Sequence, residues 1–339
     1  MTVPVVLPVD PLAPEPAVIA RAASVLCNGG LVVFPTETVY GLGANALDRT
    51  AVARIFAVKG RPTNNPLIIH VESIPQATML TRRWTSLTEK LVNVFWPGPL
   101  TLVLPRSRQV PVEVTGGGDT VAIRWPIHPV ARALITMAGC PIAAPSANRS
   151  TELSPTCAEH VLRGLAEGYD LLLDGGPTTG GLESTVLDMT TDPPRLLRPG
   201  LISPSEIADQ IGPIERVDLT NRDQTRNPLP SPGMMTKHYS PRTPLICVDS
   251  EDEAKYLVVG HVQQGRRVGL LTWNANVEHS MPGVIAIEMP RDVAGYALKL
   301  YAYLHDLDSA VVDVIVVTLP PNEDEWLAVR DRLQRAAAK

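Results

Sequence analysis

Short apolar runs alternate along the chain with longer segments in which apolar residues recur every three or four positions. The short runs are typical of buried strands, and the periodic segments are typical of amphipathic helices. In the first two thirds, strands are predicted at residues 31–34, 66–71, 100–104, 120–124, 141–144, 170–173 and 184–188. Helices predicted between them include residues 17–27, 86–95 and 129–137, which end near Gly29, Pro97 and Gly139. This alternation indicates an α/β fold.

The alternation is interrupted between Val217 and Thr243, where four prolines and Gly233 leave little room for regular structure. Beyond this segment, strands are predicted at 244–248, 267–272, 284–287 and 314–318, and helices at 251–261, 293–305 and 325–338. A chain of 339 residues is also longer than most single domains. We therefore predict a large α/β domain over residues 1–215, a proline-rich linker over 216–243 and a smaller α/β domain over 244–339.

Composition narrows the class of protein. The chain is 45% hydrophobic and 19% charged, and no apolar run approaches the roughly 20 residues of a membrane span. Its first 16 residues lack the basic and then apolar layout of a secretion signal, so we expect a cytoplasmic protein without membrane contact. The net charge of -5 and the absence of a long basic run argue against stable nucleic-acid binding. The four cysteines form no CxxC pair, so neither a zinc site nor a disulfide framework is expected.

Familiar catalytic signatures are missing. Residues 41–46 fit a GxGxxA pattern, but six residues separate the predicted strand from the first glycine, and basic residues stand where the pattern expects an acidic one. Turns are therefore the better interpretation. The sequence contains no GxxxxGK[ST], GxSxG or HExxH motif. Covalent catalysis and a resident metal site therefore have no obvious basis in the sequence.

Polar clusters instead follow the predicted strands, which is where open α/β sheets bind ligands. Residues 35–41 carry hydroxyl groups that could orient a small substrate or merely cap a turn. Lys59, Arg61 and Asn65 form a candidate anion clamp, although both cations could simply complement a helix end. His70 could equally be a core histidine.

Three further clusters come later in the chain. Strand alternation places Thr120 and Arg124 on one face, where both could meet one ligand, although a surface arginine is the alternative. Ser146 follows a small-residue strand, and Ser154 precedes a predicted helix whose first turn could bind phosphate or only be capped. Glycine-rich and charged residues around 174–185 and 196–200 complete the set.

In this order, the motifs PTETVYGLGANA, KGRPTNNPLIIH, FWPGPLTLVL, VAIRWPIHPVA, PIAAPSAN, SPT, DGG, ESTV and LRPG resemble the YrdC-like domain of threonylcarbamoyl-AMP synthases. The motifs SPGM and HYSP, followed by a small α/β unit, resemble the linker and carboxy-terminal domain of the two-domain form of that family. The resemblance implies an open, twisted YrdC-like α/β domain followed by a smaller Rossmann-like α/β domain.

The resemblance also implies roles for individual residues. The residues expected to bind L-threonine are Thr38, His70, Arg124, Ala144 and Ser184, with Ala144 acting through its backbone. Those expected to bind ATP are Arg61, Asn65, Thr120, Ser146, Ser154, Arg198 and Tyr239. Lys59, expected to face the phosphates or the carbamate, and Arg61 are the candidate catalytic residues. The prolines and Tyr239 suggest that the linker folds over the nucleotide as a lid, and a rigid spacer is the alternative.

Two segments depart from the family pattern. Residues 149–153 read Arg-Ser-Thr-Glu-Leu where the family usually has a glycine-containing turn, so the geometry near Ser154 is uncertain from sequence. Residues 234–239 read Met-Met-Thr-Lys-His-Tyr in place of a more basic stretch. A phosphate contact from the linker is therefore in question.

The implied reaction joins L-threonine, bicarbonate and ATP into threonylcarbamoyl-AMP and pyrophosphate, for threonylcarbamoyladenosine modification of tRNA. Such a transfer needs alignment and charge neutralisation rather than a protein nucleophile. Few carboxylates stand out, so Mg²⁺ is expected to arrive with ATP. A downstream threonylcarbamoyl-transferase complex would receive the product. The alternatives are a carbamoyl-transfer maturation enzyme, which would need zinc-finger cysteines, and an RNA-binding module.

Overall fold

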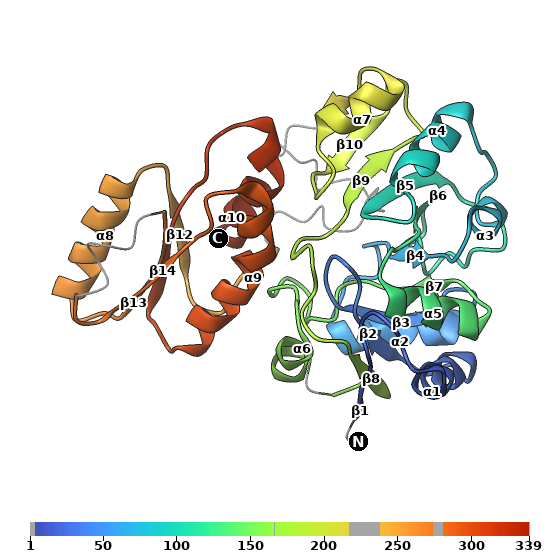
Figure 1. The fold of residues 1–339 in the computed structure, drawn as a ribbon, viewed down its shortest axis with the longest axis horizontal. Coiled ribbons are helices and arrows are strands. Elements are labelled where there is room, and N and C mark those ends of the chain that lie inside the picture. Colours follow the sequence, from blue (N-terminus) through green and yellow to red (C-terminus); the bar gives the residue numbers. More distant parts are fainter. Residues whose placement is uncertain (1–3, 166, 217–237, 274–280, 339) are drawn as a thin grey trace.

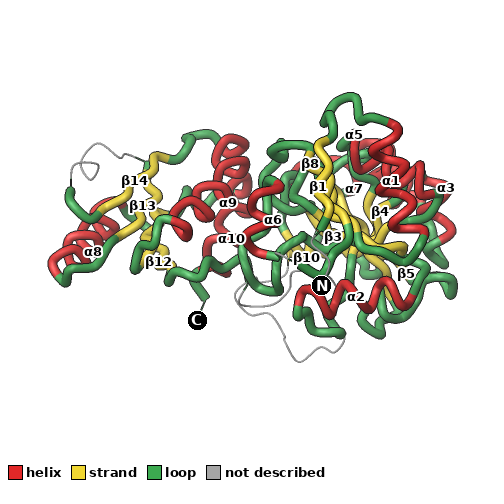
Figure 2. The backbone as a smooth tube through the Cα atoms, turned by 90° about the horizontal axis from the view of Figure 1, so that it is seen from below, coloured by secondary structure: helices red, strands yellow, loops and turns green. Residues whose placement is uncertain are grey.

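The structure is a computed structural model that describes residues 4–165, 167–216, 238–273 and 281–338. Two β-sheets organise this part of the chain, one in each of two parts that lie side by side in Figures 1 and 2. Most of the predicted linker, residues 216–243, lies outside the described residues. The part outside includes Met234–Lys237 and the proline-rich stretch before them.

The first part is built on an eleven-stranded mixed sheet with the order β1-β8-β2-β3-β7-β4-β6-β5-β9-β10-β11. Its strands are β1 Val5–Pro8, β2 Val32–Phe34, β3 Gly41–Asn45, β4 Ile68–His70, β5 Leu100–Pro105, β6 Thr120–Arg124, β7 Ile142–Ala143, β8 Leu171–Asp174, β9 Thr185–Asp188, β10 Arg195–Arg198 and β11 Glu215–Arg216. Its helices are α1 Pro16–Cys27, α2 Arg49–Lys59, α3 Ile74–Met79, α4 Ser86–Phe95, α5 Pro129–Ala138, α6 Ala158–Gly164 and α7 Pro204–Ile211.

Local sequence explains where the elements near the site end. Asp48 caps the first turn of α2 by accepting hydrogen bonds from the backbone of Thr50 and Ala51. Gly60 ends the same helix with a φ of 60°, a left-handed conformation that glycine adopts at little cost. The chain therefore turns sharply between Lys59 and Arg61, and these two cations point in different directions.

Strand register brings two predicted site residues together. Strands β4 and β6 are parallel neighbours, and His70 is paired with Arg124 in their register. Both residues are the last of their strands, so their side chains lie at one edge of the sheet. In open α/β sheets, ligands bind at the edge formed by the carboxyl ends of the parallel strands.

The second part is a four-stranded parallel sheet with the order β12-β15-β13-β14. The strands are β12 Leu245–Val248, β13 Val268–Thr272, β14 Val284–Glu288 and β15 Val314–Thr318. The helices are α8 Glu251–Gln263, α9 Val293–Ser309, the short 3₁₀ helix Asp324–Trp326 and α10 Leu327–Ala336. In Figure 1, α9 and α10 lie between this sheet and the larger part of the chain, and α8 lies on the far side.

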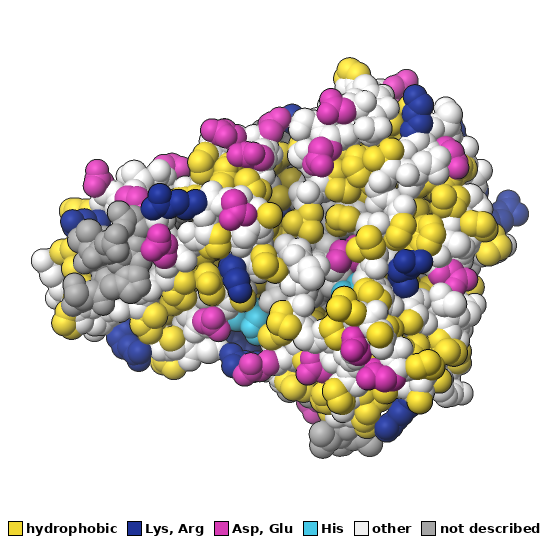
Figure 3. All heavy atoms as spheres, viewed as in Figure 1, with side chains coloured by type: hydrophobic (Ala, Val, Ile, Leu, Met, Phe, Trp, Pro, Cys, Tyr) yellow, Lys and Arg dark blue, Asp and Glu magenta, His cyan; other side chains and the backbone are white. Residues whose placement is uncertain are grey.

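The two parts share a hydrophobic core. Val39, Leu153 and Leu182 of the first part belong to the same buried cluster as residues of α9 and α10, such as Leu300 and Val329. In the part of the chain that the structure covers, no helix has the length and apolar character needed to cross a bilayer. On the face shown in Figure 3, acidic and basic side chains are interspersed rather than gathered into one basic area.

The predicted α/β class is confirmed, and β6, β15 and α4 have the predicted bounds. The interpretation of residues 41–46 as turns was wrong, because Gly41–Asn45 forms strand β3 in the middle of the sheet. A Cβ atom on Gly43 would lie 2.7 Å from the Phe34 ring, so this glycine allows close packing within the sheet. Strands β1, β10 and β11 were also missed; all three are short and lie at or near the edges of the sheet.

Candidate active site

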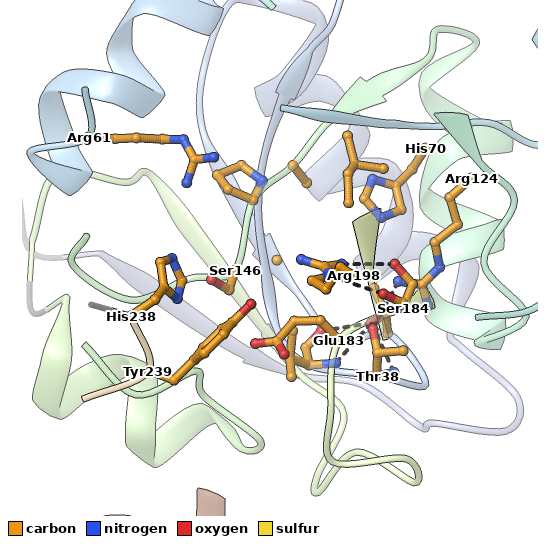
Figure 4. Close-up of a pocket in the computed structure, with 16 residues that line it drawn as sticks. Thr38, Arg61, His70, Arg124, Ser146, Glu183, Ser184, Arg198, His238 and Tyr239 are labelled. Carbon is orange, nitrogen blue, oxygen red and sulfur yellow. Dashed lines mark hydrogen bonds between the residues drawn. The ribbon is translucent and has the colours of Figure 1, made fainter. Parts of the chain in front are cut away.

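A cleft opens at the carboxyl ends of β4 and β6, beside the loops that follow β2 and β7 (Figure 4). The residues predicted to bind threonine all line it, namely Thr38, His70, Arg124, Ala144 and Ser184. Of those predicted to bind ATP, Arg61, Ser146, Arg198 and Tyr239 line it. The sheet edge therefore collects side chains from segments that are up to 200 residues apart.

Arg124 is held rigidly at one end of the cleft. Its Nη2 donates to Glu37 Oε1 at 2.5 Å, its Nη1 donates to Thr38 Oγ1 at 2.9 Å, and its Nε donates to the Gly98 carbonyl at 3.3 Å. Both members of the Arg124–Glu37 ion pair are buried. A fixed guanidinium group with donors remaining on both terminal nitrogens suits a carboxylate ligand.

His70 lines the cleft beside Arg124 as a neutral imidazole. Burial, reinforced by the charge of Arg124, lowers the pKa of His70 to about 3. Its buried Nδ1 makes no hydrogen bond in the structure. An unpaired ring nitrogen next to a bound guanidinium group can pair with a hydroxyl or amino group of a ligand.

Ser184 and Arg198 form a second polar pair in the cleft. Arg198 Nη2 donates to Ser184 Oγ, and its Nε donates to the Ser184 carbonyl, both at 3.1 Å. The Ser184 hydroxyl also lies 2.7 Å from Thr101 Oγ1. These contacts fix Arg198 although burial lowers its pKa.

Arg61 supplies a further buried cation. Its Nε donates to the Asn65 carbonyl, and its Nη2 donates to Asn65 Oδ1 at 2.6 Å and to the Pro66 carbonyl. Asn65 itself does not line the cleft, and its hydrogen bond to Arg61 connects it to the site. Burial lowers the pKa of Arg61 to about 9, which leaves the group positively charged near neutral pH.

Lys59 lies behind the wall of the cleft. Its Nζ donates to the carbonyls of Ser146, at 2.6 Å, and Asn148. Burial, together with the charge of Arg61, lowers the pKa of Lys59 well below its usual value. Lys59 thus fixes the loop that presents Ser146, and its expected contact with phosphates or carbamate stays a prediction.

Glu183 is a buried carboxylate at the boundary between the two domains. Its Oε1 accepts from Ser154 Oγ at 2.5 Å, and its Oε2 accepts from Arg332 Nε at 2.8 Å. Tyr301 Oη lies 3.2 Å from Glu183 Oε2. Burial tends to raise the pKa of Glu183, but Arg332 and Arg198 outweigh it and the pKa is lowered. Ser154 therefore meets the site through Glu183 rather than by lining the cleft.

His238 and Tyr239 line the opposite side of the cleft, as Figure 4 shows. Tyr239 is 1% exposed and has a φ of 61°. Arg332 and Arg335 lie 5.0 and 4.9 Å from the centre of its ring, as in cation–π contacts. A non-glycine residue with positive φ at a ligand site is characteristic of stored strain. The Tyr239 hydroxyl and His238 Nδ1 are buried without hydrogen-bond partners.

The structure separates Thr120 from the cleft. Thr120 and Arg124 occupy opposite ends of β6, four residues and roughly 13 Å apart. Thr120 pairs with Pro105 on the neighbouring strand and does not line the cleft. Its assignment to ATP stays a prediction, and the idea that its hydroxyl joins Arg124 on one ligand has no support from this geometry.

A family model described as "Telomere recombination" matches residues 24–200, and one described as "Threonylcarbamoyl-AMP synthase, C-terminal domain" matches residues 202–338. The threonylcarbamoyl-AMP synthase of Bacillus subtilis is 44% identical over 97% of this chain and 95% of its own. That of Pyrococcus abyssi is 42% identical over 93% of each chain.

The chain belongs to the threonylcarbamoyl-AMP synthase family. A solved structure, P. abyssi Sua5 complexed with L-threonine, has a TM-score of 0.91 and 40% identity, covering 98% of this chain and 97% of that one. Two family models, one for each domain, match this chain. The second model begins at residue 202, before the first strand of the second sheet. The predicted two-domain family and fold are therefore confirmed.

Residues 149–153, which depart from the family pattern, form a turn with Thr151 in a left-handed conformation. Thr151 has a φ of 74°, in the left-handed region that a glycine-containing turn would enter without strain. The turn is held by Ser150 N–H donating to the Lys59 carbonyl and by Ser240 N–H donating to the Thr151 carbonyl, both at 2.9 Å. The turn therefore keeps its shape without glycine, and Ser154 reaches Glu183.

Four functional candidates were missed from the sequence. Glu37, Glu183 and His238 lie within motifs quoted for the family resemblance but were given no role. The acidic residue in each of the motifs PTETVYG and ESTV was the available signal, because a carboxylate beside a buried arginine is rarely accidental. Arg332 lies in a charged helix whose sequence resembles a solvent-exposed one, so no local signal identified it.

Proposed function

We propose that this chain is an L-threonylcarbamoyladenylate synthase, a nucleotidyltransferase that converts L-threonine, bicarbonate and ATP to threonylcarbamoyl-AMP and pyrophosphate. The observation that carries the proposal is the division of one cleft into two ends. In Figure 4, Arg124 and the neutral His70 lie at one end, Arg61 and Tyr239 lie at the other, and Arg198 lies between them, bonded to Ser184. The related P. abyssi structure is described as a complex with L-threonine.

The first end suits an α-amino acid. The guanidinium group of Arg124 is preset by Glu37, Thr38 and Gly98, and its remaining donors would bind the threonine carboxylate. The unpaired Nδ1 of His70 would accept a hydrogen bond from the amino or hydroxyl group of threonine. Ser184 would add a hydroxyl contact, and Ala144 lines the same end.

The second end, together with Arg198, suits a triphosphate. Arg61 and Arg198 are buried cations, each fixed by hydrogen bonds to backbone and side-chain oxygens. Fixed cations neutralise charge on phosphate oxygens without reorganising during the reaction. Tyr239 would place an aromatic face against the nucleotide, and Asn65, Ser146 and Ser154 would support the surrounding loops.

The chemistry would proceed in two steps. The neutral amino group of threonine attacks the carbon of bicarbonate, and loss of one water molecule gives the N-carboxylate. An oxygen of that carboxylate then attacks the α-phosphorus of ATP, and the bond to the β-phosphate oxygen breaks to release pyrophosphate. Alignment and charge neutralisation carry such a transfer, so the cleft needs no protein nucleophile.

Mg²⁺ is proposed to enter with ATP as part of the substrate. Glu183 is the one carboxylate among the described residues that line the cleft, and its oxygens are already bonded to Ser154, Arg332 and Tyr301. In the described part of the chain, no group of three or more His, Cys, Asp or Glu residues could hold a metal ion. The donor set therefore fits phosphate-bound Mg²⁺ better than a protein-bound ion.

The product would serve threonylcarbamoyladenosine modification of tRNA in the cytoplasm, through a threonylcarbamoyl-transferase complex. The test of the proposal is release of pyrophosphate from ATP, measured with each substrate omitted in turn. Release should require both L-threonine and bicarbonate. Arg198→Met should abolish most of it, whereas Arg195→Met on the same strand, which removes an ion pair with Glu215, should not. Equal release without threonine would contradict the proposal.

A further inference from the structure

We propose that the carboxy-terminal domain completes the nucleotide end of the cleft, with Arg332 as the positioning residue. This inference rests on the proposed function, because that function assigns ATP to Arg61, Arg198 and Tyr239. Helix α10 carries Arg332, whose side chain is fully buried, from the second domain into the first.

Arg332 contacts both the segment that leads into β9, which carries Ser184, and the segment that follows β10, which carries Arg198. Its Nε donates to Glu183 at 2.8 Å, and its Nη2 donates to the Pro199 carbonyl at 2.9 Å. Glu183 immediately precedes Ser184, and Pro199 immediately follows Arg198. One guanidinium group from the second domain therefore sets the spacing of the Ser184–Arg198 pair.

Arg332 also supports two other residues on the nucleotide side. Glu183, which it fixes, accepts the hydroxyl hydrogen of Ser154 at 2.5 Å. The ring of Tyr239 has both Arg332 and Arg335 within about 5 Å of its centre. Asp331 accepts from Arg332 Nη1 at 2.7 Å and so fixes the guanidinium group within its own helix.

The threonine end is organised differently. The hydrogen bonds to the Arg124 side chain come from Glu37, Thr38 and Gly98, all of which belong to the first domain. A change at Arg332 should therefore disturb ATP binding much more than threonine binding, because Ser184 is the one proposed threonine contact next to a residue that Arg332 holds. A purely structural role in holding the domains together would affect both or neither.

Three arginines and two carboxylates are buried together around Tyr239. Glu183 accepts from Arg332, and Asp331 accepts from Arg332 and Arg335, whereas Arg198 is bonded to Ser184. Removing one member of a buried ion pair leaves the other uncompensated, which is far more costly than loss of a surface pair. Loss of Arg332 would leave Glu183 free to draw Arg198, or a proton, toward itself.

The test is equilibrium binding of ATP and of L-threonine, measured separately by calorimetry on the full-length chain. Arg332→Met should weaken ATP binding by at least about tenfold and L-threonine binding by no more than about threefold. The matched control is Arg330→Met on the same helix, because Arg330 contacts Asp249 and Pro320 within the second domain. It should leave both affinities unchanged.

A milder variant keeps the inference testable if Arg332→Met does not fold. Tyr301→Phe removes only the hydroxyl that lies 3.2 Å from Glu183 and should weaken ATP binding by about threefold. ATP affinity unchanged in every folded variant, or equal losses for ATP and threonine, would overturn the positioning role. Failure of the wild-type chain to bind ATP would instead contradict the proposed function.

Discussion

Glu37 Oε1 lies 2.5 Å from Arg124 Nη2, and both side chains are buried at the end of the cleft that we propose binds threonine. A buried ion pair of this kind is weak evidence for stability, since desolvation offsets much of its attraction. The ion pair instead fixes the orientation of the Arg124 guanidinium group, because Glu37, Thr38 and Gly98 each accept a hydrogen bond from a different nitrogen of that planar group. The remaining donors then face the cleft in a fixed direction.

Arg124→Lys should weaken L-threonine binding by about 2 kcal/mol or more, because an ammonium group cannot reproduce the forked geometry in a desolvated site. ATP binding should change little, because Arg124 lies at the other end. Calorimetric titration of each substrate measures both effects. An unchanged threonine affinity would remove Arg124 from the substrate site.

Tyr239→Ala should weaken ATP binding by about 1–3 kcal/mol through loss of the aromatic face. It should also increase the amount of free threonine and AMP formed per pyrophosphate, if Tyr239 helps to shield the mixed anhydride from water. Tyr239→Phe keeps the ring contacts with Arg332 and Arg335 and separates the role of the ring from that of the hydroxyl. If Tyr239→Ala matches the wild type in both measurements, the residue has no part in nucleotide binding.

Thr151→Asn should stabilise the protein by about 1 kcal/mol. Thr151 has a φ of 74°, which is costly for a β-branched residue and tolerated by asparagine. Val311, with a φ of 54° and 75% exposure, offers a second site where the same substitution should act in the same direction. Urea denaturation of each variant checks this, and a loss of stability at both sites would show that backbone strain is not the controlling factor.

Stability should depend on pH through the stacked histidines between α6 and α9. The rings of His160 and His305 lie 3.9 Å apart, and burial lowers their pKa values to about 3 and about 4. Unfolded histidine has a pKa of about 6.5, so the unfolded chain binds protons that the folded chain does not. The free energy of unfolding should therefore fall as the pH is lowered from about 6.5 toward 4.

His160→Gln tests this dependence directly. It removes one proton-binding group of the unfolded state, so the slope of unfolding free energy against pH should decrease by about 1.4 kcal/mol per pH unit between pH 6 and 4.5. His70 and His238, which are also buried and neutral, are retained in both proteins. Identical slopes in urea titrations of the two proteins would show that His160 is not held neutral by the fold.

The sequence was informative wherever function depends on a residue at a strand end. The sequence predicted Arg124 at the end of a strand and His70 one residue before the end of another, and the register of β4 and β6 then brought them together. Thr120 shows the limit of the same reasoning, because alternation fixes the face of a strand but not the distance along it. Thr120 lies four positions before Arg124 on β6, at the end of the strand away from the cleft.

Contacts between the domains could not be predicted. The last helix contains four charged residues in ten and looks solvated, yet Asp331, Arg332 and Arg335 are buried. Their burial depends on partners more than 90 residues away, namely Glu183, Pro199 and Tyr239. The lid hypothesis stays a prediction, because most of residues 216–243 lies outside the part of the chain that the structure describes. Among the described residues of that segment, His238 and Tyr239 line the cleft.

The most direct test of the account is identification of the product. The enzyme would be incubated with ATP, L-threonine and ¹³C-labelled bicarbonate, and the adenylate product analysed by mass spectrometry. We predict an adenylate that contains both threonine and one labelled carbon, formed in step with pyrophosphate and strongly reduced in Arg124→Lys. An adenylate that lacks the labelled carbon, or pyrophosphate release without any threonine-containing adenylate, would contradict the account.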